Sequence, residues 1–98
     1  MTNAELKDMI ADMVTDEEEL DNIIVLEGDE FADGAIGITE SNELVYSYSR
    51  LVKSLSEKTD MTEVDAMEWL DYNTIRSLPY MERHGNVPII IHEFKEDM

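Results

Sequence analysis

Hydrophobic and polar positions follow two different periods along the chain, and the first segment has the helical one. Thr2-Asn3-Ala4-Glu5 carries the residues of a capping box, in which the Thr hydroxyl accepts from the amide of Glu5 and the Glu carboxylate accepts from the amide of Thr2. A helix is therefore expected to begin here. Apolar residues then recur at the spacing of one helical face, namely Leu6, Met9, Ile10, Met13 and Val14.

The period changes to that of strands in the next part of the chain. The acidic run 16–19 repels itself, and we interpret it as a turn or a fraying helix end. Residues 23–26 are β-branched and short enough to predict a strand. Residues 34–39 and 44–46 predict two more strands, because the residues between them have the composition of a turn. The last two strands have the pattern of a hairpin.

A period of about 3.6 residues returns from Ser47 onwards and predicts a second helix with Tyr48, Leu51, Val52 and Leu55 on one side. Thr62 is placed to cap a third helix with acids in its first turn. The apolar stripe of this third helix consists of Val64, Met67, Leu70, Ile75 and Leu78.

Pro79 predicts that the third helix stops by Leu78, because proline disfavours helical geometry in the residue before it. Residues 80–86 are then expected to form a loop. Residues 87–92 have apolar side chains on both faces, which predicts a strand that is covered on both sides or central in its sheet.

These elements predict one α+β domain over residues 1–98, in the order α-β-β-β-α-α-β. We expect a three- to four-stranded, mainly antiparallel sheet packed by about three helices. No internal repeat or linker divides the chain, and its length fits a single domain.

The charge of the chain narrows its choice of partner. It has 24 acidic residues against 7 basic ones, a formal net charge of −17 and a pI near 4.1. This balance disfavours direct binding to nucleic acid or to an anionic membrane and favours a protein partner with a basic surface. Neither a secretory leader pattern nor a long apolar stretch is present, so we expect a cytoplasmic location.

Motifs for chemistry are weak, and we expect a protein that is not an enzyme and has no cofactor or metal. Cysteine is absent, and no glycine-rich phosphate loop occurs. Residues 29–40 match an EF-hand loop at five positions, but Phe31 stands where an oxygen ligand is needed, so an acidic turn leading into a strand at Gly34 is the better interpretation. His84 and His92 lack a partner pattern for catalysis.

The acids are unevenly distributed, which suggests a candidate binding surface. Residues 1–43 hold fourteen acids against Lys7, a net charge of −13, whereas residues 44–98 hold ten acids and six bases. A folded face with a dozen carboxylates can imitate the field of DNA towards a basic groove. The candidate contacts are Asp8, Asp12, Asp16, Glu17, Glu18, Glu19, Asp21, Glu27, Asp29 and Glu30.

Aromatic residues and an arginine are concentrated in residues 69–80, which contain the only Trp. Such residues are enriched at binding hot spots, so an alternative interface consists of Trp69, Tyr72, Arg76 and Tyr80. The favoured interpretation is packing, in which Trp69 and Tyr80 complete the core while Asn73 and Arg76 tie the helix to the sheet.

Five motifs give the chain a family resemblance: residues 33–37, 45–48, 61–63, 69–80 and 88–90. The fourth is the most specific and has the form W-[IL]-[DE]-Y-N-T-I-R-x-L-P-Y. With these motifs the chain resembles a family of small acidic, largely uncharacterised proteins of phages and prophages of Gram-positive bacteria. The resemblance implies a phage accessory function and transfers no catalytic residue. The chain departs from the family pattern in the loop Met81 to Asn86 and in the polar tail after Ile91.

Two functions are therefore expected. The first is a non-enzymatic inhibitor, similar to a DNA mimic, that blocks a host nucleic-acid-binding defence protein in the manner of anti-CRISPR or anti-restriction proteins. The alternative is a structural or assembly module that pairs with a phage protein, or with itself as a homodimer, through the segment that begins at Trp69.

Overall fold

The first helix begins where the sequence predicts. The computed structural model describes residues 1–94, and the last four residues of the predicted domain, 95–98, lie outside the described residues. α1 spans Asn3–Met13. Its cap Thr2 accepts a hydrogen bond from the amide of Glu5, and the Glu5 carboxylate accepts one from the amide of Thr2, so the predicted capping box is confirmed.

Only part of the predicted apolar face of α1 is buried. Leu6, Ile10 and the C-cap residue Val14 belong to the core. Met9 and Met13 are 53% and 70% exposed, although the same periodicity assigns them to this face. The buried side of α1 is therefore narrower than the sequence pattern indicates, and the two methionines lie at its margin.

The acidic run forms the start of a helix of its own, so its interpretation as a turn or fraying end is wrong. α2 spans Glu17–Asp21, and the carboxylate of Asp16 accepts hydrogen bonds from the amides of Glu18 and Glu19. An Asp cap and acids in the first turn both stabilise a helix N-terminus, where the backbone dipole is positive. These two effects oppose the repulsion within the run.

The predicted strand over residues 23–26 is also wrong. The segment is extended, but only Ile23 makes a bridge, an isolated parallel one with Asn86. The amide of Leu26 instead donates a hydrogen bond of 3.0 Å to the buried hydroxyl of Tyr46. A side chain thus satisfies a backbone group that a neighbouring strand would otherwise pair.

The predicted hairpin is confirmed. After a short helix that the sequence pattern missed, α3 (Asp29–Ala32), β1 (Ala35–Ile38) and β2 (Leu44–Ser47) pair in antiparallel register. The pairing shifts by one residue between Ala35 and Gly37, which is a bulge in the edge strand β1.

The last strand is shorter than predicted and lies at an edge. β3 (Ile89–Ile91) pairs in parallel with β2 alone, with Tyr46 opposite Ile90. The strand order is β1-β2-β3, so of the two predicted alternatives, a strand covered on both sides or one central in the sheet, the central position is wrong. Ile91 is exposed, while its two predecessors are half-buried.

The two later helices begin at the predicted residues. α4 (Tyr48–Thr59) is capped by Ser47, whose hydroxyl accepts from the amide of Arg50. α5 (Glu63–Trp69) is capped by Thr62. Leu51 and Leu55 of α4 are fully buried, which agrees with the apolar side that the periodicity predicts.

The third predicted helix does not stop at Leu78. α5 continues into a π-helical turn, η1 (Leu70–Thr74), and then into 3₁₀ turns, η2 (Ile75–His84), with Pro79 inside. The loop expected over residues 80–86 is therefore mostly helical. The φ angle that proline imposes is compatible with a 3₁₀-helix, so the change of helix type accommodates Pro79.

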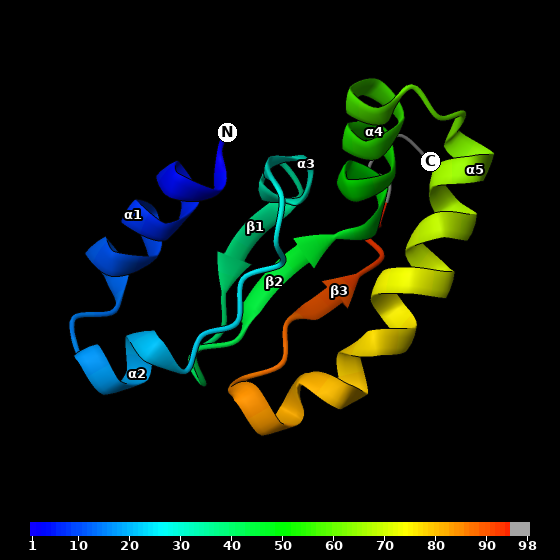
Figure 1. The fold of residues 1–98 in the computed structure, drawn as a ribbon. Coiled ribbons are helices and arrows are strands. Elements are labelled where there is room, and N and C mark those ends of the chain that lie inside the picture. Colours follow the sequence, from blue (N-terminus) through cyan, green and yellow to red (C-terminus); the bar gives the residue numbers. More distant parts are fainter. Residues whose placement is uncertain (95–98) are drawn as a thin grey trace.

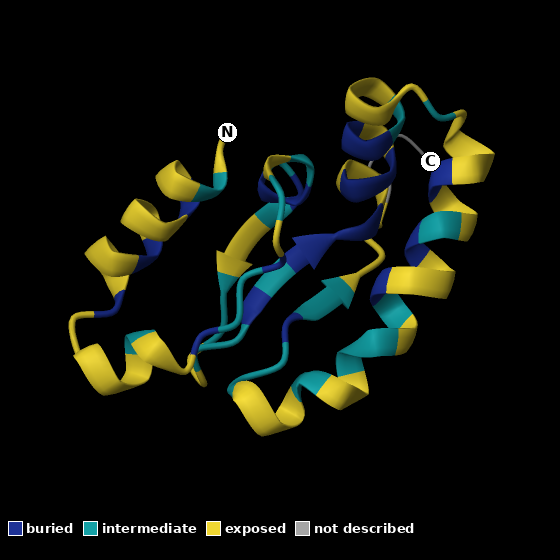
Figure 2. Cartoon of the chain, in the orientation of Figure 1, coloured by how far each residue is buried: buried dark blue, intermediate teal, exposed yellow. Residues whose placement is uncertain are grey.

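The helices flank the sheet on two sides. α1 and α2 lie on the side of β1, and the run from α5 to η2 lies on the side of β3 (Figure 1). The buried residues line the inner surfaces of both groups and of α4, while their outer surfaces are exposed (Figure 2). The α+β class and the small three-stranded sheet are confirmed, but the sheet is mixed. The predicted order of elements holds from the hairpin onwards, whereas α2 and α3 stand where one strand is predicted between α1 and the hairpin. No helix within residues 1–94 is long and apolar enough to cross a membrane.

Candidate partner-binding surfaces

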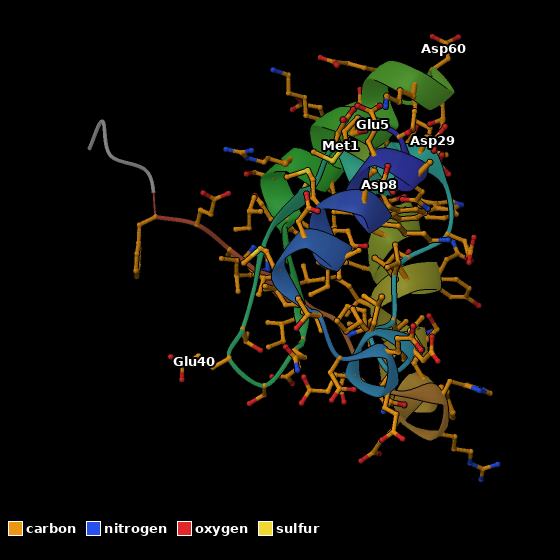
Figure 3. All side chains as sticks on the ribbon, turned by 90° about the vertical axis from the view of Figure 1, so that its left-hand side faces the viewer. Met1, Glu5, Asp8, Asp29, Glu40 and Asp60 are labelled. Atoms are coloured by element: carbon orange, nitrogen blue, oxygen red, sulfur yellow. The ribbon has the colours of Figure 1, made fainter. Side chains whose placement is uncertain are left out.

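The outer side of α1 carries three of the chain's carboxylates. Leu6 and Ile10 fix the inner side of the helix, and Glu5, Asp8 and Asp12 lie away from it, exposed to solvent. Figure 3 looks onto α1 and shows Glu5 and Asp8 projecting from it. This geometry follows from the helical period, since residues three and four apart share a face.

α2 extends this row with a denser group of acids. Asp16, Glu17, Glu18, Glu19 and Asp21 are all exposed. Asp16 also caps the helix through two backbone amides, so its carboxylate has a structural role as well. We call the exposed acids of α1 and α2 the acidic face: Glu5, Asp8, Asp12, Asp16, Glu17, Glu18, Glu19 and Asp21.

The three predicted contacts near α3 are less free than those of α1 and α2. Asp29 accepts a hydrogen bond of 2.8 Å from the amide of Asn3, which joins α3 to the first turn of α1. Glu30 is partly buried, and Glu27 is exposed in the loop before α3. The structure therefore gives Asp29 a packing role and leaves Glu27 the most accessible of the three.

One carboxylate of the first half is neutralised, and sequence reasoning did not single it out. Asp33 lies 2.7 Å from the ammonium of Lys58 and 2.6 Å from the amino group of Met1. The hydrogen bond from Lys58, followed by that from the Met1 amino group, lowers the pKa of Asp33 below its ordinary value. The same contact raises the pKa of Lys58.

The acidic face has no comparable compensation. Within residues 1–94, Asp33 is the only carboxylate of the first 43 residues that lies within ion-pairing distance of a cation. Lys7 is exposed on α1 and makes no ion pair in this part of the chain. Glu40 lies apart from the acidic face at the hairpin turn (Figure 3). The negative charge of the first half is thus concentrated on α1 and α2.

The residues of the alternative interface differ in how far they are buried. Trp69 is partly buried and packs on Phe31, with ring centroids 6.1 Å apart. It lines a cavity of about 390 Å³ between the extended segment 24–27 and the helical run, together with Asn73 and Met81. Trp69 therefore belongs to the packing of the domain, as the favoured interpretation expects.

The other three residues of the alternative interface are exposed, so the packing interpretation is wrong for Tyr80 and Arg76. Tyr72 and Tyr80 are 69% and 81% exposed, and the guanidinium of Arg76 lies over the ring of Tyr72 at 4.9 Å. Asn73 donates to the carbonyl of Trp69 within its own helix and does not tie it to the sheet.

A groove between α1 and β1 was missed at the sequence level. It has a volume of about 280 Å³, and its exposed apolar residues are Met1, Met9 and Met13 at α1 and Ile36 of β1. The signal in the sequence was two methionines on one margin of an amphipathic helix, a residue type common on adaptable binding surfaces.

The weaker motifs of the sequence lie on different elements of the fold. Residues 29–40 form α3, a turn and β1, and the carboxylates of Asp29 and Asp33 bind groups of the protein itself, so this segment is not an EF-hand loop. His84 is exposed at the end of η2. His92 follows β3 and stacks on Tyr48 with centroids 4.5 Å apart.

Comparisons of the chain with protein-family models, with curated proteins and with solved structures find no match. Two of the candidate surfaces combine exposure with a distinct chemistry: the acidic face on α1 and α2, and the row of Tyr72, Arg76 and Tyr80 on the helical run.

Proposed function

We propose that this protein is a non-enzymatic inhibitor whose acidic face occupies a basic, nucleic-acid-binding surface of a protein partner. The observation that carries the proposal is the concentration of uncompensated carboxylates on α1 and α2. Opposite charge steers association and selects partners with a complementary potential.

The acids of α1 form a row along the helix axis, as the phosphates of a nucleic acid strand do along theirs, but with a wider spacing. Along α1, Glu5, Asp8 and Asp12 are separated by three and four residues, which is a rise of about 4.5 and 6 Å. One DNA strand has a rise of about 3.4 Å per phosphate. The carboxylates along α1 are farther apart than the phosphates of a DNA strand. The consecutive acids of α2 add a denser group of carboxylates at the end of this row.

The partner is proposed as a host defence protein that handles nucleic acid, the target class of anti-CRISPR and anti-restriction proteins. This part of the proposal is supported by the sequence resemblance to phage and prophage proteins and by the charge. The proposed class of partner can be tested, because a mimic competes with nucleic acid for the same surface of the partner.

The test uses the immobilised full chain, nuclease-treated bacterial lysate and elution with increasing salt. A variant with Asp8→Lys, Asp12→Lys and Asp21→Lys reverses three exposed charges, none of them in the first turn of a helix. The control variant carries Glu40→Lys, Glu57→Lys and Glu82→Lys, which changes the net charge equally at exposed positions elsewhere.

We expect the wild type and the control to retain a nucleic-acid-binding protein that is released at about 0.5 M salt, where exposed charges are screened. Duplex DNA should displace it, and the variant of the acidic face should not retain it. Retention by that variant, or failure of DNA to compete with the captured protein, would contradict the proposal.

A further inference from the structure

Exposed residues recur at intervals of four positions along the helical run from α5 to η2. Their order is Glu68, Tyr72, Arg76 and Tyr80, with Val64 one step before them. Val64 is 63% exposed, Tyr72 69% and Tyr80 81%. We call these five residues the helix stripe. Large side chains that are this exposed contribute little to the core, and Tyr and Arg are typical of interface hot spots.

Arg76 is held in place but has no acidic partner. Its guanidinium lies over the Tyr72 ring at 4.9 Å, which fixes the side chain on the outer surface by a cation–π contact. Among residues 1–94 no carboxylate lies within ion-pairing distance of it, although acids outnumber bases more than threefold in the chain. Its donors are therefore free to bind a carboxylate of another molecule.

The helix stripe is complementary in charge to the helix stripe of a second copy. If two copies pack these helices antiparallel about a two-fold axis at Tyr72, Glu68 of each copy is opposite Arg76 of the other. In that register the two Tyr72 rings meet at the axis. A two-fold contact uses the same patch on both molecules, so the patch must be complementary to itself. The helix stripe has this property because an acid and a base lie at equal distances on either side of an aromatic residue. Val64 lies on α5 one turn before Glu68, and Tyr80 lies in the 3₁₀ turns of η2 beyond Arg76.

The distribution of charge favours this orientation over others. Two molecules of net charge −17 repel each other, and the repulsion is smallest when their acidic faces are far apart. α1 and α2 lie on the opposite side of the sheet from α5 to η2 (Figure 1), so contact through the helix stripe keeps the acidic faces at the two distant ends. Contact through the groove beside α1 would bring them together.

We propose that the helix stripe is a homodimer interface, in which Arg76 pairs with Glu68 of a second copy across a two-fold axis at Tyr72. The dimer displays two acidic faces that point away from each other. The interface is independent of the acidic face, so either proposal can fail without the other.

The experiment is sedimentation of the full chain over a micromolar to millimolar range at moderate salt. We expect a reversible monomer–dimer equilibrium. Glu68→Arg and Arg76→Glu, each alone, should raise the dissociation constant about tenfold or more, since each replaces two ion pairs by like charges. The double variant exchanges the charges and should restore dimerisation. Lys53→Glu, an exposed reversal on α4, is the matched control.

The melting temperature of each variant shows whether its fold is kept. Glu68→Gln and Arg76→Gln are two further variants that remove a charge without reversing it. Tyr80→Ala should weaken the dimer without lowering the melting temperature. A chain that stays monomeric throughout, or a charge exchange that does not restore association, overturns the proposal. So does a dimer that survives these changes but is lost on Met13→Lys, because it forms through the groove between α1 and β1.

Discussion

The hydroxyl of Tyr46 accepts a hydrogen bond of 3.0 Å from the backbone amide of Leu26, twenty residues earlier in the chain. Tyr46 is completely buried in β2, and Leu26 belongs to an extended segment with almost no strand pairing. One side chain therefore attaches the segment between α2 and α3 to the sheet. This attachment positions α1 and α2, and with them the acidic face.

Removal of that hydroxyl should destabilise the fold more than its size suggests. Tyr46→Phe leaves the amide of Leu26 buried without a partner, and we expect a loss of about 1–3 kcal/mol in the free energy of unfolding. Urea denaturation measures it. Tyr48→Phe is the control, because the Tyr48 hydroxyl makes a longer bond of 3.3 Å to Asp71 in a more accessible place. Equal losses in the two variants would contradict this role of Tyr46.

Stability should decrease at alkaline pH. Burial raises the pKa of Tyr46 to about 12, with the Leu26 amide opposing it to a lesser degree. A folded pKa above the unfolded value of about 10 means that the stabilisation is complete below pH ~10 and is lost as the pH rises towards ~12, by up to about 1.4 kcal/mol per pH unit. The free energy of unfolding, measured by denaturation at several pH values in this range, should fall more steeply with pH for the wild type than for Tyr46→Phe. Parallel curves would show that Tyr46 is not responsible.

Loss of the ion pair at Asp33 should lower the stability of the fold at acidic pH. The pKa of Asp33 is lowered chiefly by Lys58, so its contribution is present above the ordinary value of 3.8 and disappears as the pH falls through the folded pKa. Asp33→Asn should lower the melting temperature at neutral pH by at most a few degrees, since the pair is partly exposed, and should flatten the acid limb of the stability curve. Glu57→Gln, at an exposed acid on α4, should do neither.

Gly85 should tolerate no side chain. Its φ is +149°, and a Cβ built there would lie 2.3 Å from the carbonyl oxygen of Asn22. That oxygen also accepts from the amide of Asn86 at 2.7 Å, so Gly85→Ala disturbs the contact between the start of the extended segment and the end of η2. We expect a loss of about 1–3 kcal/mol. Gly37→Ala meets open space and should be nearly neutral, and similar effects of the two changes would refute the clash.

The two ends of the segment from Trp69 to Tyr80 should respond differently to truncation. Trp69→Ala removes a ring that packs on Phe31, and we expect a loss of about 3 kcal/mol. Tyr80→Ala removes a ring that is 81% exposed and should change the stability by less than about 0.5 kcal/mol. Thermal melts of dilute, monomeric protein measure both. A large loss for Tyr80→Ala would place that ring in the core after all.

Local signals in the sequence determined the starts of the helices and the hairpin. The capping box at Thr2, the caps Ser47 and Thr62 and the turn over residues 40–43 depend on residues within one turn of each other, so no distant partner is needed to predict them. The concentration of acids in the first half was also visible. Asp16 followed by three glutamates is also a signal for a helix start, because the cap and the helix dipole stabilise the first turn despite the repulsion within the run.

Tertiary contacts decided the rest, because they join residues that no local pattern connects. The extended segment at residues 23–26 is no strand, since its neighbour is the hydroxyl of Tyr46 and not a second backbone. Pro79 lies inside the helical run because the run changes there to a 3₁₀-helix, although proline disfavours helical geometry in the residue before it. Only the packing of Trp69 on Phe31 separates the buried from the exposed aromatics of its segment. The sequence determined which residues are charged, and the fold placed the acids of α1 and α2 on one side and the helix stripe on the other.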